Sequence, residues 1–136
     1  MASIPESHQD LLVKPVVVSL VTLMPDGQPQ ATPVWADLDN GDIVVNSARG
    51  RQKDRNMTPH SRVTVLAMDP ANPYRWIEVR GEVEDVDETS GLDWINRLAK
   101  KYRGTDEYYS GANAAMKGKE QRVTYRIKPT HVNVAG

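Results

Sequence analysis

The sequence predicts a mainly β, α+β fold: a β-barrel with helices packed outside it. About seven segments either alternate apolar and polar residues or are rich in β-branched residues, which is typical of strands. Glycine-containing turns separate several of these segments, and one segment has a long helical repeat. The 136 residues suit one barrel, so we expect residues 1–136 to form a single domain.

The first part of the chain is expected to contain a short helix and three strands. Residues 7–13 predict a helix whose capping box begins at Ser7. The β-branched run from Val16 to Met24 predicts a strand that is apolar on both faces and therefore central. Strands over 29–38 and 43–47 follow turns that contain glycine, so three strands in succession predict a meander.

A short helix and two strands are expected in the middle of the chain. The helix runs from Arg51 to Met57 and the first strand from Arg62 to Met68. Alternation is cleaner from Trp76 to Val83, but Val86 falls out of phase with it. A bulge near Glu84 would restore the phase, because one extra residue reverses the side of the sheet on which later side chains lie.

The last part of the chain predicts the longest helix and two final strands. Apolar residues recur at helical spacing after Ser90, which predicts a capping box with Asp93, and Gly104 is typical of the residue that follows a helix. Residues 105–119 are compatible with a short helix or a loop. Strands are expected over 122–127 and, after Pro129, over 132–134.

The composition excludes several kinds of chemistry. The chain has no cysteine, which removes disulfides, thiolate catalysis and iron–sulfur clusters and suits a cytoplasmic protein. A net charge of −1 gives no overall field for nucleic acid or anionic membranes. No apolar stretch is long enough to span a bilayer, and the first ten residues lack the pattern of a signal peptide. The three histidines are dispersed, so we expect no metal site.

One segment, from Asn46 to Met57, concentrates positive charge. Arg49, Arg51, Lys53 and Arg55 surround a turn that leads from a strand into the predicted helix. Unpaired N–H groups at a helix N-terminus, flanked by fixed cations, suit a phosphate group. The alternative is a solvated basic turn.

Two further segments place aromatic side chains at irregular points of the predicted strands. Pro33 cannot donate to a strand ladder, so its strand lies at an edge or is broken beside Trp35. This point is either the wall of a pocket for a flat ligand or an irregular edge. Tyr74, Arg75 and Trp76 place two aromatic rings and a cation where another strand begins.

In combination, these segments resemble the split β-barrel family of flavin- and deazaflavin-binding proteins related to pyridoxamine 5'-phosphate oxidases. The resemblance runs from about Leu12 to Val134. Its landmarks are Leu23 to Pro29, Pro33 to Trp35, Asn46 and Ser47, Arg51 to Met57, Arg62 and Val63, and Val79 to Gly81 followed by an acidic run.

The resemblance implies a homodimer that binds two cofactors at the subunit interface, with the backbone of Pro33, Val34 and Trp35 along the cofactor ring. Arg51 and Lys53 match positions that hold the ribityl and phosphate groups. Asn46, Ser47 and Asn56 lie nearby in the family pattern, and Arg75 and Trp76 would come from the other subunit.

The short chain and the pattern Gly-Arg-x-Lys-x-Arg-Asn-Met look most like the subgroup that uses the deazaflavin coenzyme F-420. The oligoglutamate tail of that coenzyme would need further cations such as Arg55 or Arg75. FMN is the alternative cofactor, because its phosphate would use the same basic segment. The implied reaction is hydride transfer from reduced cofactor to a small electron-poor organic acceptor, and its catalytic acid is open between Tyr74, Tyr109 and water.

Two other functions are compatible with a barrel of this kind. The protein could carry a flavin, a deazaflavin or haem without catalysis. It could also be an oligonucleotide-binding barrel, but the net charge of −1 and the acidic run 82–88 argue against nucleic acid.

Overall fold

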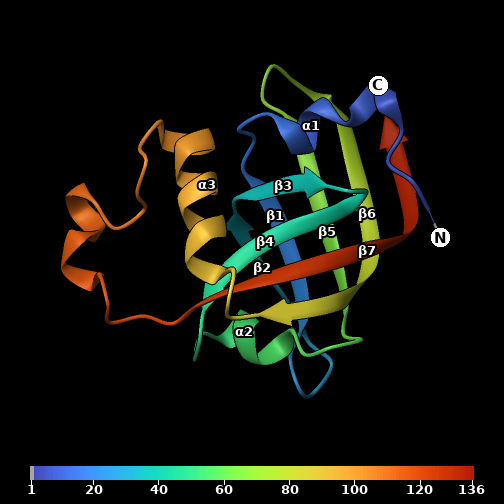
Figure 1. The fold of residues 1–136 in the computed structure, drawn as a ribbon. Helices are drawn as coiled ribbons and strands as arrows, with labels where there is room; N and C mark the ends of the chain where they lie inside the picture. The colour runs from blue at the N-terminus through green and yellow to red at the C-terminus, as the bar shows by residue number, and fades with distance from the viewer. Residues whose placement is uncertain (1) are drawn as a thin grey trace.

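Seven antiparallel strands form one sheet in the order β2-β1-β5-β6-β7-β4-β3 in the computed structural model, which describes residues 2–136 (Figure 1). The strands are β1 (Val18–Leu23), β2 (Pro29–Val34), β3 (Ala36–Asp39), β4 (Asp42–Ala48), β5 (Arg62–Asp69), β6 (Asn72–Asp87) and β7 (Arg122–Ala135). The helices are α1 (Asp10–Val13), α2 (Gln52–Asn56) and α3 (Gly91–Arg103), with 3-10 turns at Glu6–His8 and Gly111–Met116. The expected mainly β barrel with flanking helices is confirmed.

The strand predicted over 29–38 is two strands at opposite ends of the sheet order. β2 pairs with β1, whereas β3 pairs with β4, so the predicted meander is wrong. The chain bends at Trp35, next to Pro33, which has no N–H to donate. Beyond the bend, the N–H of Ala36 donates to the hydroxyl of Tyr102 at 3.0 Å. The expectation of an edge or a break at Pro33 is therefore confirmed on both counts.

The last two predicted strands are one continuous strand, β7, which pairs along most of β6. Pro129 lies within β7 opposite Gly81, and the register shifts between Arg80 and Gly81. A second shift lies between Val83 and Asp85, so the predicted bulge is confirmed. These irregularities let a strand of 14 residues accommodate a proline without ending.

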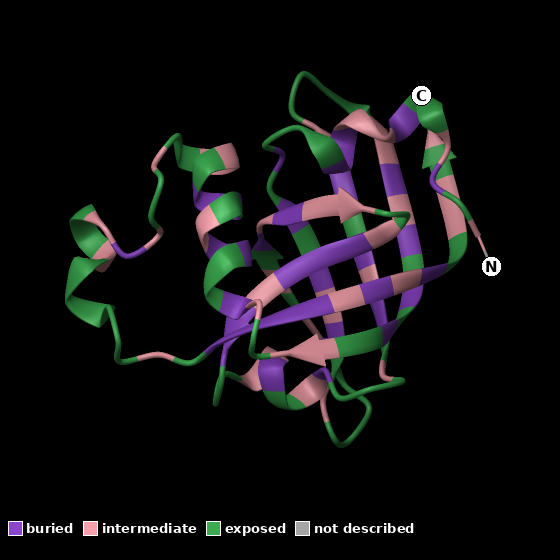
Figure 2. Cartoon of the chain, viewed as in Figure 1, coloured by how far each residue is buried: buried purple, intermediate pink, exposed green. Residues whose placement is uncertain are grey.

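β1 has neighbours on both sides, as predicted, but only one of its faces is buried. Val18 and Leu20 point into the core, whereas Leu23 is 47% exposed and the preceding Val17 55% exposed. The alternation of buried and exposed residues along β1, β5 and β6 is visible in Figure 2. The predicted central position is therefore confirmed, although in residues 2–136 the apolar side chains on the outer face of β1 are partly exposed.

α3 packs against β4 and β7 through Trp94, Ile95, Leu98 and Ala99, all of which are buried. The expected glycine after this helix is confirmed, since Gly104 has φ +73°. Neither predicted capping box forms. The hydroxyl of Ser7 bonds to His8 rather than to a helix N–H. At α3, the carboxylate of Asp87, not the side chain of Ser90, accepts from the backbone N–H of residues 89 and 90.

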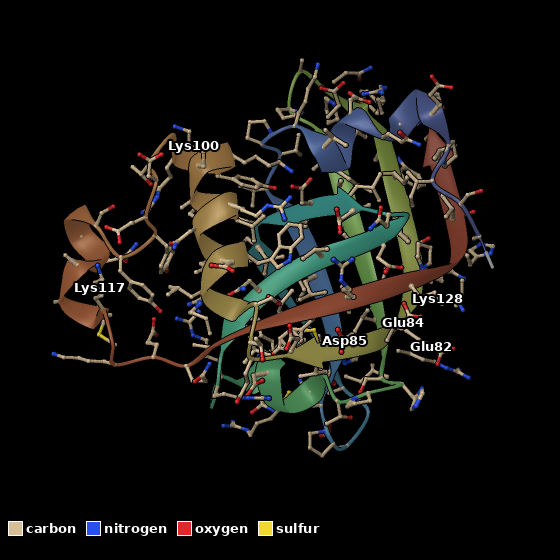
Figure 3. The ribbon with its side chains drawn as sticks, viewed as in Figure 1. Glu82, Glu84, Asp85, Lys100, Lys117 and Lys128 are labelled. Carbon is tan, nitrogen blue, oxygen red and sulfur yellow. The ribbon has the colours of Figure 1, made fainter. Side chains whose placement is uncertain are left out.

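The segment from 104 to 121 extends from α3 away from the barrel before the chain returns as β7 (Figure 1). Acidic residues of β6 lie apart from it: Figure 3 shows Glu82, Glu84 and Asp85 on the opposite side of the molecule from Lys100 and Lys117. Within residues 2–136, no helix has the length and apolar character needed to cross a membrane.

Candidate functional site

A cavity of about 320 Å³ lies where the bend between β2 and β3 faces α2 and α3. Its volume falls in the range typical of small-molecule sites. It is lined by Val17, Pro33, Val34, Trp35, Asn46, Arg51, Lys53, Ile95, Leu98, Tyr108 and Arg122. The cavity therefore combines apolar side chains from the bend and α3 with three cationic side chains.

Six of the eleven residues proposed from the sequence line this cavity: Pro33, Val34, Trp35, Asn46, Arg51 and Lys53. Ser47 is fully buried in β4, and its hydroxyl has no hydrogen-bond partner. Asn56 donates to the hydroxyl of Thr22 at 3.0 Å. The exposed side chain of Arg55 folds back on its own helix, donating to the carbonyl of Gly50 at 2.6 Å.

Arg75 and Trp76 do not line this cavity. Arg75 donates to the carboxylates of Asp10 at 2.6 Å and Asp69 at 3.2 Å, and to the carbonyl of Ser7. Trp76 lines a separate hollow on the outer face of the sheet. One chain alone does not bring these two residues to the cavity.

Trp35 forms a flat wall of the cavity because other aromatic rings hold it in place. Its ring stacks on that of Tyr102, with centroids 5.2 Å apart and planes 9° apart, and the edge of Tyr108 meets it at 5.9 Å. The hydroxyl of Tyr102 donates to the carbonyl of Val16 at 2.6 Å. Offset aromatic contacts of this kind fix ring orientation, so the wall is preorganised for a planar ligand.

Three cations converge on the cavity: Arg51, Lys53 and Arg122. Burial lowers the pKa of the Lys53 ammonium, and the charges of Arg51 and Arg122 lower it further. Lys53 donates to the hydroxyl of Thr32 at 3.3 Å, but in the described part of the chain no carboxylate lies within ion-pair distance of it. An anionic ligand would relieve this repulsion between like charges.

Arg122 is a cavity residue that sequence reasoning missed. It is only 4% exposed, and its Nε donates to Oδ1 of Asn46 at 2.9 Å. Its Nη1 is buried without a hydrogen-bond partner. The sequence predicts only a strand with alternating residues here, but residues 122–125 are all buried, where α3 packs against β7. Nothing in the local sequence distinguishes it from a solvated strand residue.

Tyr108 is the second missed residue, since the sequence left its segment between helix and loop. Its ring lies over the guanidinium of Arg122 at 5.0 Å. The ring also makes an edge contact with the ring of Tyr109. Val17, Ile95 and Leu98 were assigned to strand and helix without a role in the site. They reach the cavity through tertiary packing, which periodicity does not report.

The predicted anion site lies at a very short helix, and an internal carboxylate already binds the turn that leads into it. α2 has only five residues, and the carboxylate of Asp54 accepts from the N–H of Gly50 at 3.0 Å. Asp54 also accepts from Arg49 at 3.1 Å and from the hydroxyl of Tyr125. Anion binding at this site therefore depends on side chains rather than on the end of the helix.

Residues 4–135 match the sequence profile of pyridoxamine 5'-phosphate oxidase. The chain belongs to this family. Among solved structures, an F-420 reductase is 32% identical with a TM-score of 0.78, and the match covers 96% of this chain and 98% of that one. A search of curated proteins gave no match.

Solved structures with lower sequence identity to this member of the pyridoxamine 5'-phosphate oxidase family share its fold. A conserved hypothetical protein from Mycobacterium tuberculosis is 23% identical, with a TM-score of 0.70 and coverage of 97% of this chain and 84% of that one. A putative pyridoxamine 5'-phosphate oxidase from Lactobacillus delbrueckii is 16% identical, with a TM-score of 0.64 and coverage of 96% and 93%. The expected split-barrel fold is confirmed.

Family membership associates the chain with proteins that bind flavin-type cofactors, as oxidoreductases or as carriers. The cavity fits such a group on two observations. Trp35 provides a flat aromatic wall, and the buried Nη1 of Arg122 is an unpaired donor. A phosphorylated planar cofactor would satisfy both features.

Proposed function

We propose that this protein is a coenzyme F-420-dependent reductase that transfers a hydride to a small, electron-poor organic acceptor. The observation that carries the proposal is one cavity that joins the stacked Trp35 wall to the cations Arg51, Lys53 and Arg122. The F-420 reductase that matches nearly the whole chain at 32% identity supports the choice of cofactor.

Each part of the cavity has a proposed task. Arg51 and Lys53 bind the phosphate, and the ribityl chain is assigned to Asn46, which lines the cavity, and to Asn56, which lies outside its lining. Pro33, Val34 and Trp35 orient the planar ring, and Ile95 and Leu98 exclude water. When bound, the reduced cofactor supplies the hydride, so the protein contributes position and electrostatics. Arg55 is proposed to meet the oligoglutamate tail.

Water is the proton donor that we propose. Tyr74 is 82% exposed and lies outside the cavity lining of its own chain. Tyr109 also lies outside the lining, and its hydroxyl donates to Glu120 at 2.9 Å. Burial and the hydrogen bond to Glu120 raise the pKa of Tyr109, which makes proton release harder.

The proposal includes a homodimer, because the outer face of β1, β5 and β6 exposes a group of apolar side chains. Leu23, Leu66 and Met68 are all exposed there, and two adjoining hollows share Val21 and Thr64. Exposed apolar patches of this kind mark interaction sites. Trp76 lines one of these hollows, so a second copy on this face would meet it.

Leu66→Glu is expected to convert the dimer to a monomer, because burying an unpaired carboxylate in an apolar interface costs several kcal/mol. Sedimentation velocity at equal concentration measures the change. Leu92→Glu is the control, since Leu92 is 52% exposed on α3, away from this face. A dimer that survives Leu66→Glu would place the interface elsewhere.

An FMN-dependent oxidoreductase or a non-catalytic carrier is the second candidate. The phosphate of FMN needs the same two cations, Arg51 and Lys53, and binding does not by itself produce turnover. Binding measurements with F-420 and with FMN distinguish the two cofactors. A turnover assay with quinone and nitroaromatic acceptors then distinguishes a reductase from a carrier.

Lys53→Ala is expected to raise the dissociation constant of the cofactor by about 10- to 100-fold, because a charge-assisted hydrogen bond contributes about 1.5–3 kcal/mol. The experiment titrates wild type and variant with oxidised F-420 and FMN and follows tryptophan fluorescence. Lys100→Ala, which removes an exposed lysine of α3 (Figure 3), should bind like wild type. If the protein binds neither cofactor with a submicromolar dissociation constant, the proposed function is contradicted. Equal dissociation constants for wild type and Lys53→Ala would show that Lys53 is not part of the site.

A further inference from the structure

Glu120 is the carboxylate that pairs with two of the cations of the cavity, Arg51 and Arg122; it lies outside the cavity lining, in a separate hollow that Arg122 also lines. Its Oε2 accepts from Nη2 of Arg51 at 3.0 Å, and its Oε1 lies 3.6 Å from Nη1 of Arg122. In residues 2–136, no other carboxylate lies within ion-pair distance of either guanidinium. The side chain of Glu120 is only 17% exposed. It therefore occupies a partly buried position between two arginines that line the cavity.

The three contacts of Glu120 are of two kinds. Arg51 and Tyr109 make hydrogen bonds with it at 3.0 and 2.9 Å. The 3.6 Å separation from Arg122 is an ion pair without a hydrogen bond, which leaves the buried Nη1 an unpaired donor. A buried charged donor in this state is costly. Arg122 would therefore gain from an oxygen placed closer than that of Glu120.

The position of Arg122 does not depend on Glu120. Its Nε donates to Asn46, whose own amide group donates to the carbonyl of Gly91 at 2.9 Å. The ring of Tyr108 covers the guanidinium. Because the hydrogen bonds come from β4 and, through Asn46, from α3, Arg122 keeps its orientation when the carboxylate moves.

Building on the proposed function, we propose that Arg122 is a further phosphate-binding residue of the cavity and that Glu120 is an exchangeable internal anion. The phosphate group of the ligand takes the place of the Glu120 carboxylate between Arg51 and Arg122. No bond is made or broken in this exchange. Glu120 thus competes with the ligand, and its removal increases affinity for phosphate.

The charges around Glu120 support this role. Burial acts to raise the pKa of Glu120, but hydrogen bonds from Tyr109 and Arg51 and the charges of Arg51 and Arg122 hold it below its usual value. Glu120 is thus a carboxylate at neutral pH, matched to the cations that a phosphate would use. A phosphate brings more charge and more acceptor oxygens than a carboxylate, so it can reach the unpaired Nη1 as well.

Glu120 also lies next to the end of the segment from 104 to 121 that extends from the barrel. Tyr109 lies in the same segment and holds Glu120 through its hydroxyl. Exchange of Glu120 for a phosphate therefore loosens one attachment of this segment beside the cavity. Binding of the phosphate and the packing of the segment are coupled through a single carboxylate.

The test measures binding of inorganic phosphate to the full chain at constant ionic strength, with tryptophan fluorescence as the signal. Glu120→Gln should tighten phosphate binding by about five- to tenfold, and Arg122→Gln should weaken it by at least about tenfold. Glu107→Gln is the matched control, because Glu107 is an exposed acid of the same segment paired with Lys117. Arg126→Gln controls for charge on β7, since Arg126 pairs with Asp39 outside the cavity lining.

Unchanged or weaker phosphate binding in Glu120→Gln would overturn the exchange, as would an equal gain in Glu107→Gln. Tyr109→Phe provides a second variant if Arg122→Gln does not fold: it frees Glu120 from one hydrogen bond and should change phosphate affinity by less than Glu120→Gln does. The phosphate measurement needs no cofactor. Failure of both F-420 and FMN to bind would therefore contradict the proposed function alone, and an unaltered phosphate affinity in Glu120→Gln would contradict this exchange alone.

Discussion

Gly91→Ala is expected to lower the free energy of unfolding by about 3 kcal/mol, the upper end of the usual cost of overpacking. Gly91 is the first residue of α3, at the point where the helix crosses β7. A Cβ there would clash with the carbonyl of Arg122 and lie 2.9 Å from the nitrogen of Val123. These are backbone atoms of a paired strand, so neither can move without disturbing β7.

Urea denaturation followed by circular dichroism measures this loss. The backbone of Gly91 lacks the positive φ that favours glycine, so the cost is steric rather than conformational. Asp93→Asn is the control from the same helical turn, and as an exposed substitution it should stay within about 0.5 kcal/mol of wild type. Equal midpoints for Gly91→Ala and wild type would mean that α3 can separate from β7 without cost.

The same clash predicts a weaker ligand site, because β7 carries Arg122 into the cavity. The carbonyl of Gly91 accepts from Asn46, and Asn46 in turn accepts from Arg122. Displacing α3 would disturb both bonds. Stability and site geometry are thus linked through one close approach of helix and strand.

The fold could be predicted from the sequence largely because each strand carries local signals. The turn at Gly41, the alternation before Val83 and the bulge that Val86 requires depend only on neighbouring residues. The ends of the sheet did not follow from such signals. Trp35 divides one apparent strand between the two sheet edges, and Pro129 lies inside a strand that was expected to begin after it. Both outcomes depend on strand partners that are distant in sequence.

Only part of the candidate site could be predicted, again because the sequence shows local signals and not contacts between distant residues. Lys53 and Trp35 belong to segments whose composition is unusual by itself, and the structure places both at one cavity. Arg122 and Glu120 belong to an ordinary polar stretch before the last strand. Their importance follows from burial and from contacts with residues distant in sequence, neither of which composition or spacing encodes.

The position of the basic helix α2 depends on one buried carboxylate. Asp54 is 7% exposed and accepts from the N–H of Gly50, from Arg49 and from the hydroxyl of Tyr125. Tyr125 is fully buried in β7. The contact therefore ties the helix that carries Lys53 to the central part of the sheet.

Asp54→Ala is expected to lower the free energy of unfolding by about 3–5 kcal/mol, because it leaves Tyr125 and Gly50 without their acceptor and Arg49 without one of its two carboxylates. Tyr125→Phe should cost less, about 1–2 kcal/mol, since Asp54 keeps its other two donors. Urea denaturation of both single variants and the double variant gives the coupling energy. A coupling near zero would show that the Tyr125 hydroxyl does not hold Asp54.

The pH dependence of stability tests the same contact independently. Burial raises the pKa of the Tyr125 hydroxyl, and the hydrogen bond to Asp54 and its charge raise it further. An unfolded tyrosine ionises near pH ~10, whereas the folded one stays protonated above that pH. The raised pKa thus favours the folded state fully below pH ~10, and this contribution is lost as the pH rises toward the folded value. Above pH ~10, wild type should lose stability more steeply than Tyr125→Phe, while Tyr102 and Tyr109 contribute equally to both. Parallel curves would mean that Tyr125 ionises as readily in the folded protein as in the unfolded chain, and that the link between α2 and the sheet does not depend on its proton.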